Sequence, residues 1–93
     1  MYDYKECRKE IFTENGVKLL IEVKDLIESY LEVSEAFKMN AVLKSLTGDC
    51  WTMMACVDYF VEMGLIKEID QSLGDNIHSQ GRVFVKSYSA NPL

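Results

Sequence analysis

The sequence predicts a mainly α-helical domain that ends in a small β-hairpin, and three observations support this. Residues 16–33 carry apolar side chains at the three- and four-residue spacing of an amphipathic helix. Residues 50–63 form a second regular stretch, which ends at Gly64, the residue type favoured where a helix terminates. Two β-prone runs then follow, at 65–71 and 82–88, and the turn-forming residues 72–81 separate them.

Length and composition indicate one ordinary globular domain. The chain has 93 residues, of which 48% are hydrophobic and 27% are charged. It contains no apolar run long enough to span a membrane and no recognisable secretion leader. Its three cysteines are an odd number and form no disulfide framework. We therefore expect a cytoplasmic protein in a reducing compartment.

The first fifteen residues are expected to hold a short amphipathic helix and a break. Helical spacing joins four residues between charged ones: Tyr4, Cys7, Ile11 and Phe12. Glu14-Asn15-Gly16 then interrupts the pattern. Because Asn-Gly between apolar flanks is also a hairpin signal, residues 11–23 could instead form two strands. Helical periodicity continues well beyond Gly16, so we favour a helix, a break and a second helix.

Residues 16–33 form the most regular stretch and carry two adjacent apolar stripes. The first consists of Leu19, Val23, Leu26, Tyr30 and Val33, and the second of Leu20, Ile27 and Leu31. One interpretation is a central helix that is buried over a broad arc. The other is that one stripe faces a second subunit, because so short a chain has difficulty covering two apolar faces. We therefore predict a homodimer that forms through this helix and the N-terminal segment, with these interface residues: Phe12, Leu20, Ile27 and Leu31.

Residues 34–64 are expected to hold a connection and two further helices. Residues 34–38 leave room for one small strand, and Asn40 is a suitable N-cap for a brief helix at 41–46. Thr47-Gly48-Asp49 is a tight turn, in which Thr47 or Asp49 caps the next helix. After that helix, Leu65 should pack back on Phe60 in the core.

The helix at 50–63 is expected to bury one face and expose the other. The predicted core face consists of Met53, Cys56, Val57, Phe60 and Met63, and the outward face of Trp51, Thr52, Ala55, Asp58, Tyr59 and Glu62. Trp51 has two interpretations. It is either an anchor for a partner or a core residue that closes the preceding turn, and we favour burial.

The order of these elements resembles the winged helix-turn-helix superfamily, in its small prokaryotic or phage type. The resemblance spans roughly residues 16–88 and depends on Met53, Val57-Asp58-Tyr59-Phe60 and Met63-Gly64-Leu65-Ile66-Lys67-Glu68-Ile69. It implies a single domain over residues 1–93, with an N-terminal extension at 1–15, a helical core at 16–64 and a wing hairpin at 65–88. In members that read DNA, the third helix enters the major groove and the wing contacts the backbone.

Charge weighs against that mode of DNA binding. Lys and Arg number 10 against 15 for Asp and Glu, and none of the cations lies between Asp49 and Leu65. If the protein binds DNA, its candidate contacts are Lys44, Lys67, Arg82 and Lys86 for phosphates, and Trp51, Thr52 and Tyr59 on the third helix. Period-two alternation places Arg82, Phe84, Lys86 and Tyr88 on one strand face. The alternative is that these cations are solvated residues that balance Glu68 and Asp70.

Catalytic or metal chemistry is not expected. His78 is the only histidine, and it lies in the loop between the two β-prone runs. Cys50 and Cys56 are six residues apart, which is not the spacing of a zinc site. Cys50, at a helix N-terminus, is either a redox-sensing thiol or a small packing residue. We expect no enzyme, no cofactor and no metal.

Two functions therefore follow from the sequence. The first is a small dimeric DNA-binding protein that regulates transcription, with double-stranded DNA as its partner, because most winged helices of this size read DNA. The second is a winged-helix module that docks a protein partner and does not bind DNA. The fold favours the first function and the charge favours the second.

Overall fold

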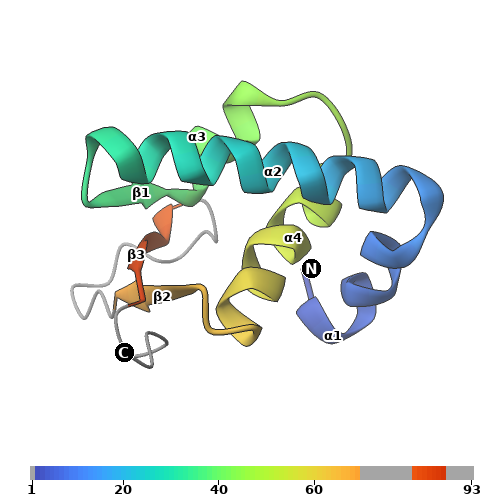
Figure 1. The fold of residues 1–93 in the computed structure, drawn as a ribbon. Helices are drawn as coiled ribbons and strands as arrows, with labels where there is room; N and C mark the ends of the chain where they lie inside the picture. Colours follow the sequence, from blue (N-terminus) through green and yellow to red (C-terminus); the bar gives the residue numbers. More distant parts are fainter. Residues whose placement is uncertain (1, 70–80, 88–93) are drawn as a thin grey trace.

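The computed structural model describes residues 2–69 and 81–87, which are mainly helical with a small antiparallel sheet (Figure 1). The long helix α2 lies across the molecule, α4 lies beneath its middle, and the sheet and α1 lie towards opposite ends of α2. The elements are α1 (Tyr4–Cys7), the 3-10 helix η1 (Arg8–Phe12), α2 (Glu14–Val33), β1 (Ala36–Lys38), α3 (Met39–Ser45), α4 (Cys50–Glu62), β2 (Ile66–Ile69) and β3 (Val83–Lys86).

The N-terminal break lies one residue before the expected tripeptide, and no hairpin forms at residues 11–23. Thr13 caps α2, because its hydroxyl oxygen accepts a hydrogen bond from the backbone N–H of Gly16 at 3.0 Å. Gly16 is buried against η1, where a Cβ atom would lie only 2.6 Å from the Cα of Ile11. Glycine is therefore needed here for a close backbone approach and not for a turn.

The core stripe of α2 combines residues from both expected stripes. Gly16, Leu19, Val23 and Ile27 are buried, whereas Val33 is 85% exposed. Ile27, expected at a dimer interface, therefore belongs to the core of its own chain. Three other predicted interface residues stay accessible to different degrees: Leu20 and Leu31 are half-buried, and Phe12 is exposed.

The starts of α4 and α3 confirm one expected cap and correct another. Asp49 caps α4, because its carboxylate accepts from the N–H of Thr52 at 3.1 Å and from its hydroxyl at 2.7 Å. Asn40 is not a cap, since α3 already begins at Met39, whose N–H donates to the carbonyl of Arg82 at 2.8 Å. That bond ties the start of α3 to the sheet.

Gly64 ends α4 as expected, with a φ of 80° that favours glycine. The N–H of Leu65 donates to the carbonyl of Phe60, and that of Gly64 to Val61, both at 3.0 Å, which is the Schellman arrangement. Phe60 is buried, but Leu65 and Met63 are more than half exposed, so the expectation that they belong to the core is wrong. The backbone returns to Phe60 while the Leu65 side chain points outward.

Helix α4 is buried on more than one side. All residues from 52 to 57 are buried, so Thr52 and Ala55 are not on an exposed face as expected. The reason is that α4 contacts η1 and α1 as well as α2, α3 and β2. Trp51 is 43% exposed, which corrects the favoured burial. The turn at Gly48 is closed instead by Leu19 and Met53.

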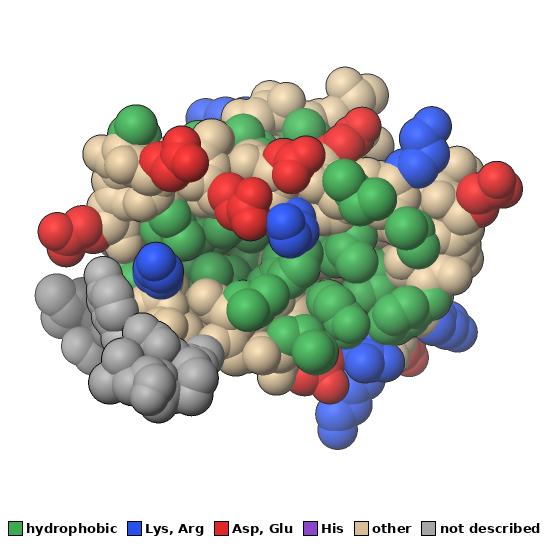
Figure 2. All heavy atoms as spheres, in the orientation of Figure 1, with side chains coloured by type: hydrophobic (Ala, Val, Ile, Leu, Met, Phe, Trp, Pro, Cys, Tyr) green, Lys and Arg blue, Asp and Glu red, His purple; other side chains and the backbone are tan. Residues whose placement is uncertain are grey.

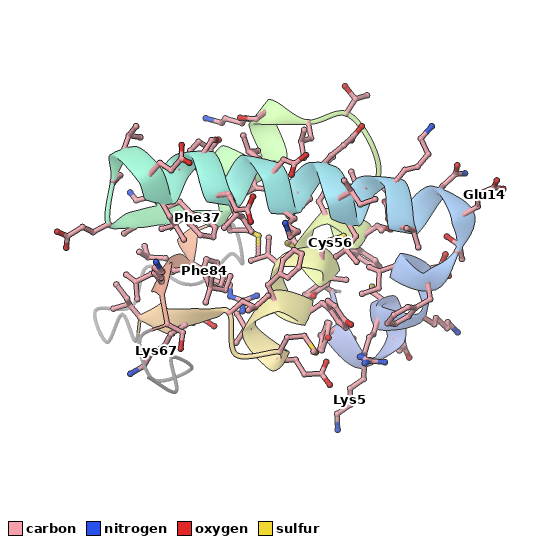
Figure 3. The ribbon with its side chains drawn as sticks, in the orientation of Figure 1. Lys5, Glu14, Phe37, Cys56, Lys67 and Phe84 are labelled. Atoms are coloured by element: carbon pink, nitrogen blue, oxygen red, sulfur yellow. The ribbon has the colours of Figure 1, made fainter. Side chains whose placement is uncertain are left out.

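The sheet has three strands in the order β1-β3-β2. The small strand for which residues 34–38 leave room does form, at residues 36–38, and it pairs with β3 beside the expected hairpin. Both pairings are antiparallel, with Phe37 opposite Phe84 and Ile66 opposite Lys86. The rings of Phe37 and Phe84 stack at 5.4 Å between centroids (Figure 3). The expected loop at 72–81, apart from Gly81, lies outside the described residues, as do Asp70, His78 and Tyr88. Within the described part of the chain, no helix has the length and apolar character to cross a membrane.

Phe60 and Leu65 provide a test of how α4 is oriented. Phe60→Ala removes a buried ring and should lower the free energy of unfolding by about 3–5 kcal/mol. Leu65→Ala removes an exposed side chain and should cost much less. Urea denaturation of both variants measures the difference, and equal losses would contradict this orientation.

Gly16 provides a test of the contact between η1 and α2. Gly16→Ala should destabilise the protein by about 1–3 kcal/mol or more, because the new methyl group meets backbone that cannot move aside. The neighbouring exposed change Asn15→Ala is the matched control and should be close to neutral. Thermal melting that shows no loss for Gly16→Ala would rule out the close approach.

Candidate functional site

Arg82, expected as a phosphate contact, lies at the centre of an ion cluster. Its guanidinium donates to Asp58 of α4 at 2.6 and 3.1 Å and to Glu68 of β2 at 2.8 and 2.9 Å. The side chain is 16% exposed and lies over the ring of Phe84. Burial lowers the pKa of Arg82, but the hydrogen bonds to Glu68 and Asp58 outweigh this and raise it above its usual value. Two carboxylates thus neutralise this charge and leave little of it for a phosphate.

The N-terminal segment, residues 2–12, packs over α4. Tyr2 donates a hydrogen bond to Asp58 at 2.6 Å, and burial together with this bond raises the pKa of its hydroxyl well above the usual value. Tyr4 donates to Glu62, and burial and that bond raise its pKa to about 12. Arg8 donates to Glu62 at 3.0 Å. Both acidic side chains of α4 are therefore already bonded within the chain.

Thr52 and Tyr59, expected near base edges, are both covered. Thr52 is buried and bonded to Asp49. Tyr59 is half-buried, its ring lies 5.7 Å from that of Phe12, and the Arg8 guanidinium lies over both rings at 5.1 to 5.6 Å. Nothing in the spacing of residues 2–12 places this segment against α4, so sequence reasoning missed the arrangement.

The remaining predicted phosphate contacts are exposed but do not converge. Lys44 lies on α3, Lys67 on β2 and Lys86 on β3. Lys86 is paired with Ile66 and Lys67 with Val85, so the two lysines lie on opposite faces of the sheet. Figure 3 shows Lys67 pointing away from the molecule. These cations come from three elements and form no single basic stripe.

The cysteines differ in environment. Cys50 is exposed in the first turn of α4, and Cys7 is half-buried. Cys56 is buried beneath α2, and burial raises the pKa of its thiol to about 12 (Figure 3). Among the described residues, no group of three or more His, Cys, Asp or Glu side chains is placed to hold a metal ion.

One side of the molecule carries an accessible apolar surface that we call the apolar face. Figure 2 shows hydrophobic side chains gathered below α2, on its N-terminal part and across the end of α4, with acidic side chains along α2 above them. Its exposed members, between about 42% and 55% accessible, are Phe12, Val17, Ile21, Met63 and Leu65, and the half-buried Leu20 and Leu31 adjoin them. Surfaces of this kind mark interaction sites in small proteins.

The apolar face is hollowed at one end. A shallow hollow of about 530 Å³ lies between α2 and the start of β2, with Ile27, Leu31, Phe60 and Leu65 among its apolar lining residues. Lys24, Glu28, Glu32 and Lys86 also line it. Two of the predicted dimer-interface residues, Ile27 and Leu31, thus meet at the hollow, whereas Phe12 and Leu20 lie elsewhere on the face.

Comparison with models of known protein families, with curated proteins and with solved structures gives no match for this chain.

The ion cluster can be tested through Arg82. Arg82→Met leaves Asp58, whose side chain is 12% exposed, without its cation, and should lower the free energy of unfolding by about 3–5 kcal/mol. Adding Asp58→Asn should restore part of this loss, since the uncompensated charge is then gone. Lys86→Met makes the same change at an exposed position and should alter stability by less than about 0.5 kcal/mol. Chemical denaturation that finds Arg82→Met as stable as Lys86→Met would refute the role of the cluster.

Proposed function

We propose that this protein is a protein-interaction module of winged-helix type, which docks its partner on the apolar face and does not read DNA through α4. The order α2, β1, α3, α4, β2, β3 and the sheet order β1-β3-β2 are compatible with a winged helix. The three free cysteines agree with a reducing compartment, and we propose a cytoplasmic location. Catalysis and cofactors form no part of the proposal.

The observation that carries the proposal is the N-terminal segment packed over α4. A groove-reading helix needs an outward face with hydrogen-bonding or cationic side chains free for bases and phosphates. Here Tyr2, Tyr4 and Arg8 cover that side of α4, and beneath them lie the carboxylates of Asp58 and Glu62. Removing the cover would present negative charge to a polyanion.

The apolar face supplies the complementary argument. An isolated exposed leucine needs no explanation, but five exposed large apolar side chains gathered on one face expose area that water disfavours. Burial of such area is the main driving force of protein association. The accessible surface thus favours an apolar partner over a phosphate backbone.

DNA binding by a dimeric regulator remains the second candidate. The order of helices and strands favours it, together with the exposed Lys44, Lys67 and Lys86. In that mode these lysines would contact phosphates without a base-reading helix, so binding would depend steeply on salt and weakly on sequence.

Fluorescence anisotropy with a random-sequence duplex at low salt separates the two candidates. We expect no saturable binding by the protein, nor by a Tyr2→Ala, Tyr4→Ala variant that loosens the cover, because uncovered α4 has no cation. Binding by this variant alone would identify a DNA reader inhibited by its own N-terminus. Binding by the unmodified protein, with a log–log salt slope that falls by about 2 in Lys67→Ala, Lys86→Ala, would establish the second candidate. Either result would overturn the proposal.

A further inference from the structure

We infer that the partner on the apolar face is a second copy of this chain, bound about a two-fold axis with the two α2 helices antiparallel. In this arrangement Ile21 of each copy enters the hollow beside Leu31 of the other, and Lys24 of each copy pairs with Glu28 of the other. The inference rests on the proposed function, because it names the occupant of the same face.

The shape of the face supports a symmetric pair. A two-fold interface uses one patch twice, so that patch must carry both the protruding and the receiving parts. The apolar face has both: Ile21 and Val17 are exposed on the N-terminal half of α2, and the hollow lies beside its C-terminal half. At a rise of about 1.5 Å per residue, Ile21 and Leu31 are about 15 Å apart along the helix. A two-fold axis midway between them places each Ile21 at the same level along the helix as the other copy's hollow.

The positions of the charges select the same register. At about 100° per residue, Lys24, Glu28 and Leu31 lie on the flank of α2 that also carries Val17 and Leu20. The antiparallel register that sets Ile21 opposite Leu31 also sets Lys24 opposite Glu28, because both pairs share the midpoint at residue 26. A register centred on Lys24 would instead oppose two lysines. Charge complementarity and the spacing of Ile21 from the hollow along the helix therefore agree on one register.

The intrahelical ion pair is compatible with this exchange. Lys24 and Glu28 bond at 3.0 Å within one chain, and their side chains are 52% and 61% exposed. A pair of this kind contributes little to stability, so its side chains can turn to a second chain at small cost. Once neighbouring apolar side chains exclude water, the same charges select partner and register more strongly.

Sedimentation equilibrium tests the dimer with the intact protein. We expect a dimer at high micromolar concentration and, for Ile21→Glu, self-association at least about tenfold weaker. Thermal melting should be unchanged at concentrations where both proteins are monomeric. Val33→Glu introduces the same charge on the opposite flank of α2, at a position that is 85% exposed, and should remain dimeric. A monomeric parent protein would overturn the inference and leave docking of a different protein or of a small apolar ligand. Equal effects of both substitutions would also overturn it.

A mixing experiment tests the register. In the proposed dimer, residue 24 of each copy faces residue 28 of the other, and we call these two contacts the cross-pairs. A dimer of Lys24→Glu would have two acidic side chains in each cross-pair, and a dimer of Glu28→Lys would have two lysines. Each variant alone should therefore associate at least about tenfold more weakly. Mixing the two should restore association as a heterodimer, because both cross-pairs then join opposite charges. Each variant has lost its own intrahelical pair, and mixing cannot restore that pair. Restored association in the mixture therefore supports the contact between copies. Single variants that associate as tightly as the parent protein, or a mixture that does not recover association, would refute it.

Discussion

The contact of Arg82 with Asp58 and Glu68 joins the sheet, α4 and the N-terminal segment of this molecule. It links the start of β3 to α4 and to β2, across 24 and 14 residues of sequence. Asp58 also accepts the hydroxyl of Tyr2, so the same carboxylate fixes the N-terminal segment. A buried charge has to be paired, because leaving it alone costs several kcal/mol. The sheet and the N-terminal cover of α4 are thereby anchored at one point.

This anchoring has a consequence for function. Arg82, the cation that the strand pattern predicts as a phosphate contact, is paired with carboxylates of its own chain. The side of α4 that would face a DNA groove is bonded to the N-terminal segment. What remains accessible is an apolar surface over α2 and the end of α4, with a hollow at one end. These features are the basis of the proposed association through apolar burial, and a fold compatible with a winged helix does not by itself imply DNA recognition.

Small size explains why so much apolar surface is left. A chain of 93 residues buries a limited share of its surface, and α4 contributes more buried residues than any other described element. The long helix α2 contributes Leu19, Val23 and Ile27 to that interior, while Val17 and Ile21 find no cover within the described chain. Such a surface is a reason for a small protein to associate.

The sequence by itself determined the local structure. Helical periodicity, the Asp49 cap and Gly64 placed α2 and α4 closely, because these signals act through neighbouring residues. Only the tertiary structure decided which faces are buried. The pairing of β1 with β3, the cover of α4 and the pairing of Arg82 depend on contacts between segments far apart in the chain, and no spacing within one segment encodes them. For this reason Thr52 is buried and Met63 is exposed, the opposite of what was expected for each. Burial depends on what packs against a helix as well as on the periodicity of the helix itself.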